Sequence, residues 1–66
     1  MKEVFSPSER RMEIFYILMN HKLITRRELA RMFNVSDDAI TRDITALSRF
    51  VPIGSKMGRY GGIYIS

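Results

Sequence analysis

Three helix-start signals constrain the fold of this chain more than any other feature of its sequence. Ser6-Pro7-Ser8-Glu9 places a capping serine before a proline and a glutamate, and Thr25-Arg26-Arg27-Glu28 repeats the pattern without the proline. In such a capping box, the hydroxyl and the carboxylate each accept a hydrogen bond from a backbone N–H that the first helical turn leaves unpaired. Ser36 precedes two aspartates, whose carboxylates suit the positive end of a helix dipole. We therefore expect helices over about residues 7–20, 26–33 and 37–49.

Apolar side chains recur at helical spacing within each segment, which indicates three amphipathic helices. Pro52 prevents a much longer third helix, because proline lacks the N–H that a helix interior needs. Val35, in the short turn before that helix, is expected to fill the core where the apolar stripes meet. The stripes are Ile14, Phe15 and Leu18; Leu29, Ala30 and Phe33; and Ile40, Ile44 and Leu47.

The pattern changes after Phe50, where apolar and polar positions begin to alternate as in a β-strand. The alternating residues run from Val51 to Met57, a glycine-rich turn covers 58–62, and Ile63-Tyr64-Ile65 forms a short return strand. A further short strand at residues 23–24 fits the pattern. We therefore expect a mainly α fold with a small β-hairpin over about residues 51–65, in one domain spanning residues 1–66.

The composition excludes several classes of protein. A 66-residue domain buries only about 60% of the surface that its unfolded chain exposes, which leaves little room to enclose a substrate. The chain has no cysteine and one histidine, His21, with no nucleophile near it and no suitable cluster of carboxylates. We therefore expect no enzyme activity, no metal, no cofactor and no small-molecule ligand within this chain.

Neither a membrane nor a secretory route is indicated. The longest apolar run, Ile14 to Met19, is far too short to cross a bilayer. A signal peptide would have a basic segment followed by an apolar one, and no such segment follows Met1-Lys2-Glu3. The expected location is the cytoplasm. Met1 is interpreted as a natural start, whereas the end at Ser66 leaves open whether the chain continues.

Eleven basic against seven acidic residues give a net charge of +4, which favours a polyanionic partner.

Residues 25–40 combine a short helix, a turn of about three residues and a second capped helix, which is the helix-turn-helix arrangement. In that motif the first helix braces against the DNA backbone, while the N-terminal turns of the second reach base edges in the major groove. The sequence therefore predicts a nucleoid-associated protein that binds double-stranded DNA.

The order and spacing of these elements resemble the winged helix-turn-helix of DeoR-type bacterial regulators over nearly the whole chain. The resemblance rests on Glu28-Leu29-Ala30, Phe33, Val35-Ser36, Ile40, Arg42-Asp43-Ile44, Leu47 and the hairpin from Pro52 to Ile65. It implies a transcriptional regulator whose third helix and wing touch DNA. Ala39 stands where the family often has a hydroxyl residue, and the family's larger effector-binding domain does not lie within these 66 residues.

The outward face of the third helix carries most of the candidate DNA contacts. Arg42 can read guanine in the groove or anchor the backbone, and the sequence leaves both roles open. Asp37 and Asp38 are interpreted first as partners of the helix dipole, ahead of an alternative in which they accept from a cytosine amino group. Asp43, beside Arg42, is interpreted as a structural ion-pair partner. The candidates on this helix are Ser36, Asp38, Thr41, Arg42, Thr45 and Arg49.

Four further basic residues are candidate contacts. Arg26 and Arg27 begin the second helix, where their charge is unfavourable to the dipole and so indicates another demand. Lys56 and Arg59 flank glycines in the wing, which could follow the phosphate backbone or enter the minor groove.

The first helix has a second apolar line, Met12, Tyr16 and Met19, which Phe5 could extend. These residues either cover the edge of the core or form the seam of a homodimer.

The leading hypothesis for the chain is a sequence-specific regulator of repressor type. The alternative is a winged-helix protein-interaction module, which would not need arginines on the third helix and wing.

Overall fold

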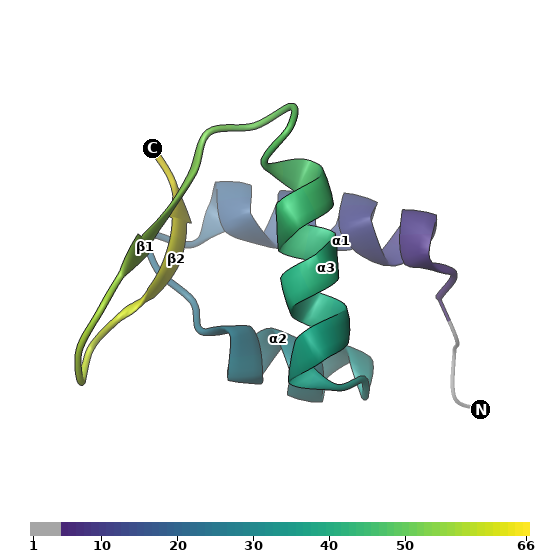
Figure 1. Ribbon diagram of the computed structural model, residues 1–66, viewed down its shortest axis with the longest axis horizontal. Helices are drawn as coiled ribbons and strands as arrows, with labels where there is room; N and C mark the ends of the chain where they lie inside the picture. Colours follow the sequence, from purple (N-terminus) through teal and green to yellow (C-terminus); the bar gives the residue numbers. More distant parts are fainter. Residues whose placement is uncertain (1–4) are drawn as a thin grey trace.

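The computed structural model describes residues 5–66; Met1, Lys2 and Glu3, read above for a targeting signal, lie outside the described residues. Helix α1 spans Pro7–Asn20 and α2 spans Arg26–Phe33, and each begins directly after the capping residue that the sequence predicts. Helix α3 spans Asp37–Leu47, and strands β1 (Ile53–Lys56) and β2 (Gly62–Ile65) form the hairpin. In Figure 1, α3 crosses in front of α1 and the hairpin projects away from the helices, on the side opposite the N-terminus. The fold is mainly helical with a two-stranded hairpin, as expected.

Both capping boxes form as the sequence predicts. The Ser6 N–H donates to Glu9 Oε1 at 2.9 Å, and the Glu9 N–H donates back to Ser6 Oγ at 3.2 Å. Thr25 and Glu28 repeat this exchange at 3.0 Å in both directions. The backbone N–H of Ser6, helped by its hydroxyl, lowers the pKa of Glu9. Each carboxylate therefore stays ionised at the helix N-terminus, where its charge also opposes the dipole.

Helix α3 ends at Leu47, two residues before the expected end at Arg49. The chain tightens there into turns, with the Arg49 N–H donating to Ala46 O at 3.3 Å and the Phe50 N–H to Leu47 O at 2.9 Å. The Val51 N–H also donates to Leu47 O, at 2.9 Å. Val51 is thus held by the end of the helix, and the first strand begins at Ile53 instead of Val51.

The hairpin is antiparallel and is attached to the chain before α2. Its register pairs Ile53 with Ile65 and ends with Lys56 opposite Gly62, so that Met57 lies in the turn. The short third strand expected at residues 23–24 is a single bridge, Ile24 to Ile63. Two hydrogen bonds form it, Ile24 N–H to Ile63 O at 3.1 Å and Ile63 N–H to Ile24 O at 2.7 Å. The hairpin is therefore fixed to the segment that leads into α2.

The core lies where the three helices and the hairpin meet, and α3 packs on both α1 and α2. Val35 in the turn and Phe33 at the end of α2 are half-buried and pack against this core. Phe15, which was expected in the stripe of α1, is also half-buried but is not among the residues packed on the core. Burial of one such Ile or Leu side chain contributes about 1.5–3 kcal/mol relative to exposure. The buried apolar residues are Ile14, Leu18, Ile24, Leu29, Ala30, Ile40, Ile44 and Ile63.

One charged side chain, Asp43 of α3, is completely buried. Its carboxylate accepts hydrogen bonds from Arg10 Nε and, at 3.2 Å, from the terminal nitrogen of the same guanidinium. Arg11 Nε donates to it at 3.0 Å. The partners of this structural ion pair are thus two arginines of α1, and not the neighbouring Arg42. The hydrogen bonds to Asp43 raise the pKa of Arg10 further above its ordinary range.

Replacing Asp43 should destabilise the fold strongly. Asp43→Ala leaves Arg10 without its buried counter-charge, and loss of one partner of a buried pair costs about 3–5 kcal/mol. Asp43→Asn, which keeps the shape, should cost less than Asp43→Ala. Urea unfolding followed by circular dichroism measures both, with Glu13→Ala as the exposed-carboxylate control on α1. A loss below about 1 kcal/mol for Asp43→Ala would contradict a stabilising role, since exposed substitutions usually change stability by about 0.5 kcal/mol or less.

Candidate nucleic-acid interface

The candidate interface begins at the turn between α2 and α3. Asn34 ends α2 in the left-handed conformation, with φ 56° and ψ 49°, which asparagine tolerates better than most residues. Ser36 then caps α3, and its Oγ accepts from the Ala39 N–H at 3.1 Å. The Ser36 hydroxyl, one of the candidate DNA contacts, is therefore used within the chain to cap α3. The three residues from Asn34 to Ser36 set α3 at a steep angle to α2 (Figure 1).

The buried residues of α3 lie on one side, and the outward side carries four of the candidate DNA contacts together. Thr41, Arg42, Thr45 and Arg49 line a shallow hollow of about 450 Å³ together with Ala46. The Thr45 hydroxyl donates to Thr41 O at 2.9 Å, so its oxygen remains able to accept a hydrogen bond from outside. Arg49 belongs to this hollow although it follows the end of the helix.

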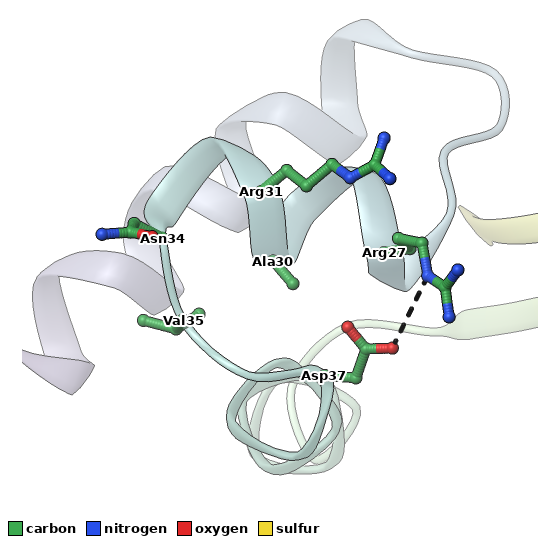
Figure 2. A pocket seen from close by; sticks show the side chains of 6 residues that line it. All are labelled: Arg27, Ala30, Arg31, Asn34, Val35 and Asp37. Carbon is green, nitrogen blue, oxygen red and sulfur yellow. Dashed lines mark ion pairs between the residues drawn. The ribbon is translucent and has the colours of Figure 1, made fainter.

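A second hollow, of about 310 Å³, lies between α2 and the start of α3. Figure 2 shows Arg27 and Arg31 extending from α2 toward the same side, with Asp37 of α3 facing Arg27. Arg27 Nε lies 4.0 Å from Asp37 Oδ2, and both side chains are largely exposed. Such an exposed pair contributes little to stability, so it leaves Arg27 available to another anion.

Arg31 was not among the residues singled out from the sequence. It follows Arg27 by four residues, a spacing that places two side chains on the same helix face, and this was the signal that could have identified it. Together the two guanidiniums make the α2 side of the hollow positive.

Other candidate residues lie outside both hollows. Arg26 is exposed in the first turn of α2. In the same turn, hydrogen bonds from the Thr25 N–H and hydroxyl lower the pKa of Glu28, so a negative charge stays at this helix N-terminus. Asp38 is exposed in the first turn of α3 and makes no ion pair within residues 5–66. Lys56 ends β1 and Arg59 lies in the hairpin turn, both exposed.

The apolar line on α1 is exposed, with Met12 73%, Tyr16 62% and Met19 58% accessible. Phe5, which was expected to extend it, is half-buried and packs edge-to-face on Phe33 of α2, with ring centroids 5.7 Å apart. The α1 stripe is therefore Met12, Tyr16 and Met19.

The described residues contain no group of three or more potential metal ligands of the His, Cys, Asp and Glu types. His21 Nδ1 lies 2.8 Å from the Ile17 carbonyl oxygen, at the end of α1. Between Phe5 and Ser66, no helix combines the length and the apolar character that crossing a membrane requires.

These elements define a helix-turn-helix with a β-hairpin beside it. Comparison with protein families agrees, because the family model described as an HTH domain matches residues 10–64. The chain therefore belongs to the HTH domain family, and the match supports a DNA-binding domain. Searches of curated proteins and of solved structures found no match.

The Arg27–Asp37 contact predicts how one carboxylate affects DNA binding. Asp37→Asn removes a negative charge beside the candidate interface and releases Arg27. It should strengthen binding to any duplex by up to about fivefold, since exposed charge pairs are worth about 0.2–1 kcal/mol. Fluorescence anisotropy at low salt measures the change. Glu13→Gln on α1 removes the same charge elsewhere, and an equal gain from both variants would show that only net charge matters.

Proposed function

We propose that the chain is a sequence-specific, double-stranded DNA-binding transcriptional regulator of the DeoR type. In this proposal α3 enters the major groove, and the hairpin lies against the backbone or in the minor groove. The repressor type follows the resemblance in sequence to DeoR-type regulators. The protein would act on DNA at the nucleoid.

The observation that carries the proposal is the hollow on the outward side of α3. Thr41 and Thr45 lie one turn apart, with Arg42 beside Thr41, on a helix whose other side is anchored in the core. A guanidinium can donate two hydrogen bonds to guanine, and threonine can donate or accept at a base edge or contact a thymine methyl group. The family match supports a DNA-binding helix-turn-helix, and in that motif the second helix of the pair is the one that reaches base edges.

The charge distribution supports this orientation. Arg10 and Arg11 are paired with Asp43, so most of the exposed positive charge within the described residues lies on α2, on and just after α3, and in the hairpin. Neutralisation of phosphates releases counterions, which makes binding depend steeply on salt. A protein-interaction module would show no such dependence on a polyanion.

Selection of bound duplexes from a random pool tests the proposal. We expect an enriched sequence, and affinity that falls as salt rises. Arg42→Ala should weaken binding to that sequence by about 1–3 kcal/mol if Arg42 reads guanine, and then relax selection at one position only. If Arg42 holds a phosphate instead, all duplexes should weaken alike and the salt slope should fall by about 1.

Lys22→Ala is the matched control, because it removes one exposed positive charge from the α1–α2 connection. It should change affinity less than Arg42→Ala. Absence of binding to any duplex at low salt would reject the proposal and favour the protein-interaction module.

We also propose that the α1 stripe of Met12, Tyr16 and Met19 joins two copies of the chain. The three residues are spaced to share one helix face, and each is more than half exposed. A second copy would supply a second α3, and two such helices can read half-sites about one helical turn apart.

Sedimentation at micromolar concentration tests this dimer. We expect a species of twice the 7.7 kDa chain mass, which Met19→Glu should convert to monomer. Met32→Glu is the matched control, because Met32 on α2 is 57% exposed against 58% for Met19. A monomer for the unsubstituted chain, with and without DNA, would contradict the seam.

A further inference from the structure

The hollow on the outward side of α3 has a small apolar side chain between two positive ones. Ala46 is half-buried and follows Arg42 by four residues, and Arg49 follows Ala46 by three, so the three share one helix face. Neither arginine makes an ion pair within residues 5–66. Both guanidiniums are therefore available to a ligand that contacts the Ala46 methyl group.

The hydroxyl groups next to this apolar centre donate their protons to the helix backbone. Thr45 Oγ1 donates to Thr41 O at 2.9 Å, and Ser48 Oγ donates to Thr45 O at 2.7 Å. A hydroxyl has a single proton, so with that proton bound to the backbone its oxygen can only accept further hydrogen bonds. Thr45 therefore offers an incoming base an acceptor oxygen and a methyl group, but no donor.

These groups distinguish the pyrimidines by their edges in the major groove. Thymine has a 5-methyl group, but its carbonyl oxygen requires a donor. Cytosine has an amino group, which suits an acceptor, but no methyl group. 5-Methylcytosine combines the amino group of the one with the methyl group of the other. It is therefore the pyrimidine that matches both the oxygen of Thr45 and the methyl groups of Thr45 and Ala46.

The two arginines favour a particular neighbour for that base. Guanine presents O6 and N7 to the major groove, and a guanidinium can donate to both acceptors. A methylated cytosine next to guanine thus fits the hollow, with its methyl group against Ala46 and the guanine against Arg42 or Arg49.

We propose that α3 recognises 5-methylcytosine beside guanine, so that methylation of cytosine in DNA strengthens binding. Thr45 and Ala46 sense the methyl group, and the Thr45 oxygen accepts a hydrogen bond from the cytosine amino group. This inference rests on the proposed function, since it takes α3 in the major groove as given. It adds a chemical mark on the DNA as a signal to which the chain responds.

Selection from two random pools, one made with cytosine and one with 5-methylcytosine, tests the inference. The methylated pool should enrich duplexes that have a methylcytosine next to guanine. An enriched duplex remade with cytosine at that position should bind roughly fourfold more weakly, because it loses the contact of one methyl group. A thymine·adenine pair there keeps the methyl group but loses the amino group, and it should also weaken binding.

Two substitutions separate the methyl group of Thr45 from its hydroxyl. Thr45→Ser keeps the hydroxyl and should lower the ratio of affinities for methylated and unmethylated duplexes. Thr45→Val keeps the methyl contact and should preserve this ratio, but should lose the preference for methylcytosine over thymine. Ser48→Ala is the matched control, because Ser48 also donates its proton to the backbone but is not among the residues that line the hollow. It should preserve both preferences.

Equal binding to methylated and unmethylated duplexes, or weaker binding to the methylated ones, would overturn the inference. If Arg42→Ala still weakened binding in that case, the proposed function would stand without it. A methyl preference that Thr45→Ser leaves unchanged would indicate a contact elsewhere and would also overturn the inference. Absence of binding to every duplex would reject the proposed function and the inference together.

Discussion

A buried ion pair between Asp43 and two arginines joins the third helix to the first. Asp43 lies fully buried on α3, and a carboxylate in that position is stable only with counter-charges and hydrogen bonds around it. Arg10 and Arg11 of α1 supply both, and the described residues hold no buried side-chain polar atom without a partner. Because Asp43 joins α3 to α1, it orients α3 about its own axis together with the buried Ile40 and Ile44. Arg42 is the residue before Asp43, so the inward position of Asp43 also places Arg42 toward the outward side of α3.

Local signals accounted for most of the architecture. A capping box is written within four residues, and amphipathic spacing within a dozen, so both could be predicted from the sequence. The partners of Asp43 could not, because 33 residues separate it from Arg10 and no local pattern records that contact. The end of α3 was missed for a related reason. Turns closed by hydrogen bonds to the carbonyl oxygens of Ala46 and Leu47 end the helix several residues before Pro52.

The candidate interface divides in the same way. Thr41, Arg42, Thr45 and Arg49 were predicted as one outward face, since helical periodicity is enough to gather them. The hollow that joins Arg27, Arg31 and Asp37 depends on the angle between α2 and α3, which the turn at Asn34 sets. Phe5 illustrates the limit of reading a stripe from spacing alone. Its ring packs on Phe33 of α2 instead of extending the line on α1, so the proposed dimer seam lacks Phe5.

The bridge between Ile24 and Ile63 has a consequence for recognition. Two backbone hydrogen bonds tie the hairpin to the residues just before α2, and Ile63 is itself completely buried. The hairpin is thus held as part of the same rigid frame as the helices. Its conformational entropy is lost when the chain folds and not when a partner arrives, so association would meet a smaller ordering cost. In the proposed function, this fixed position of the hairpin relative to α3 would require a duplex whose grooves have a matching separation.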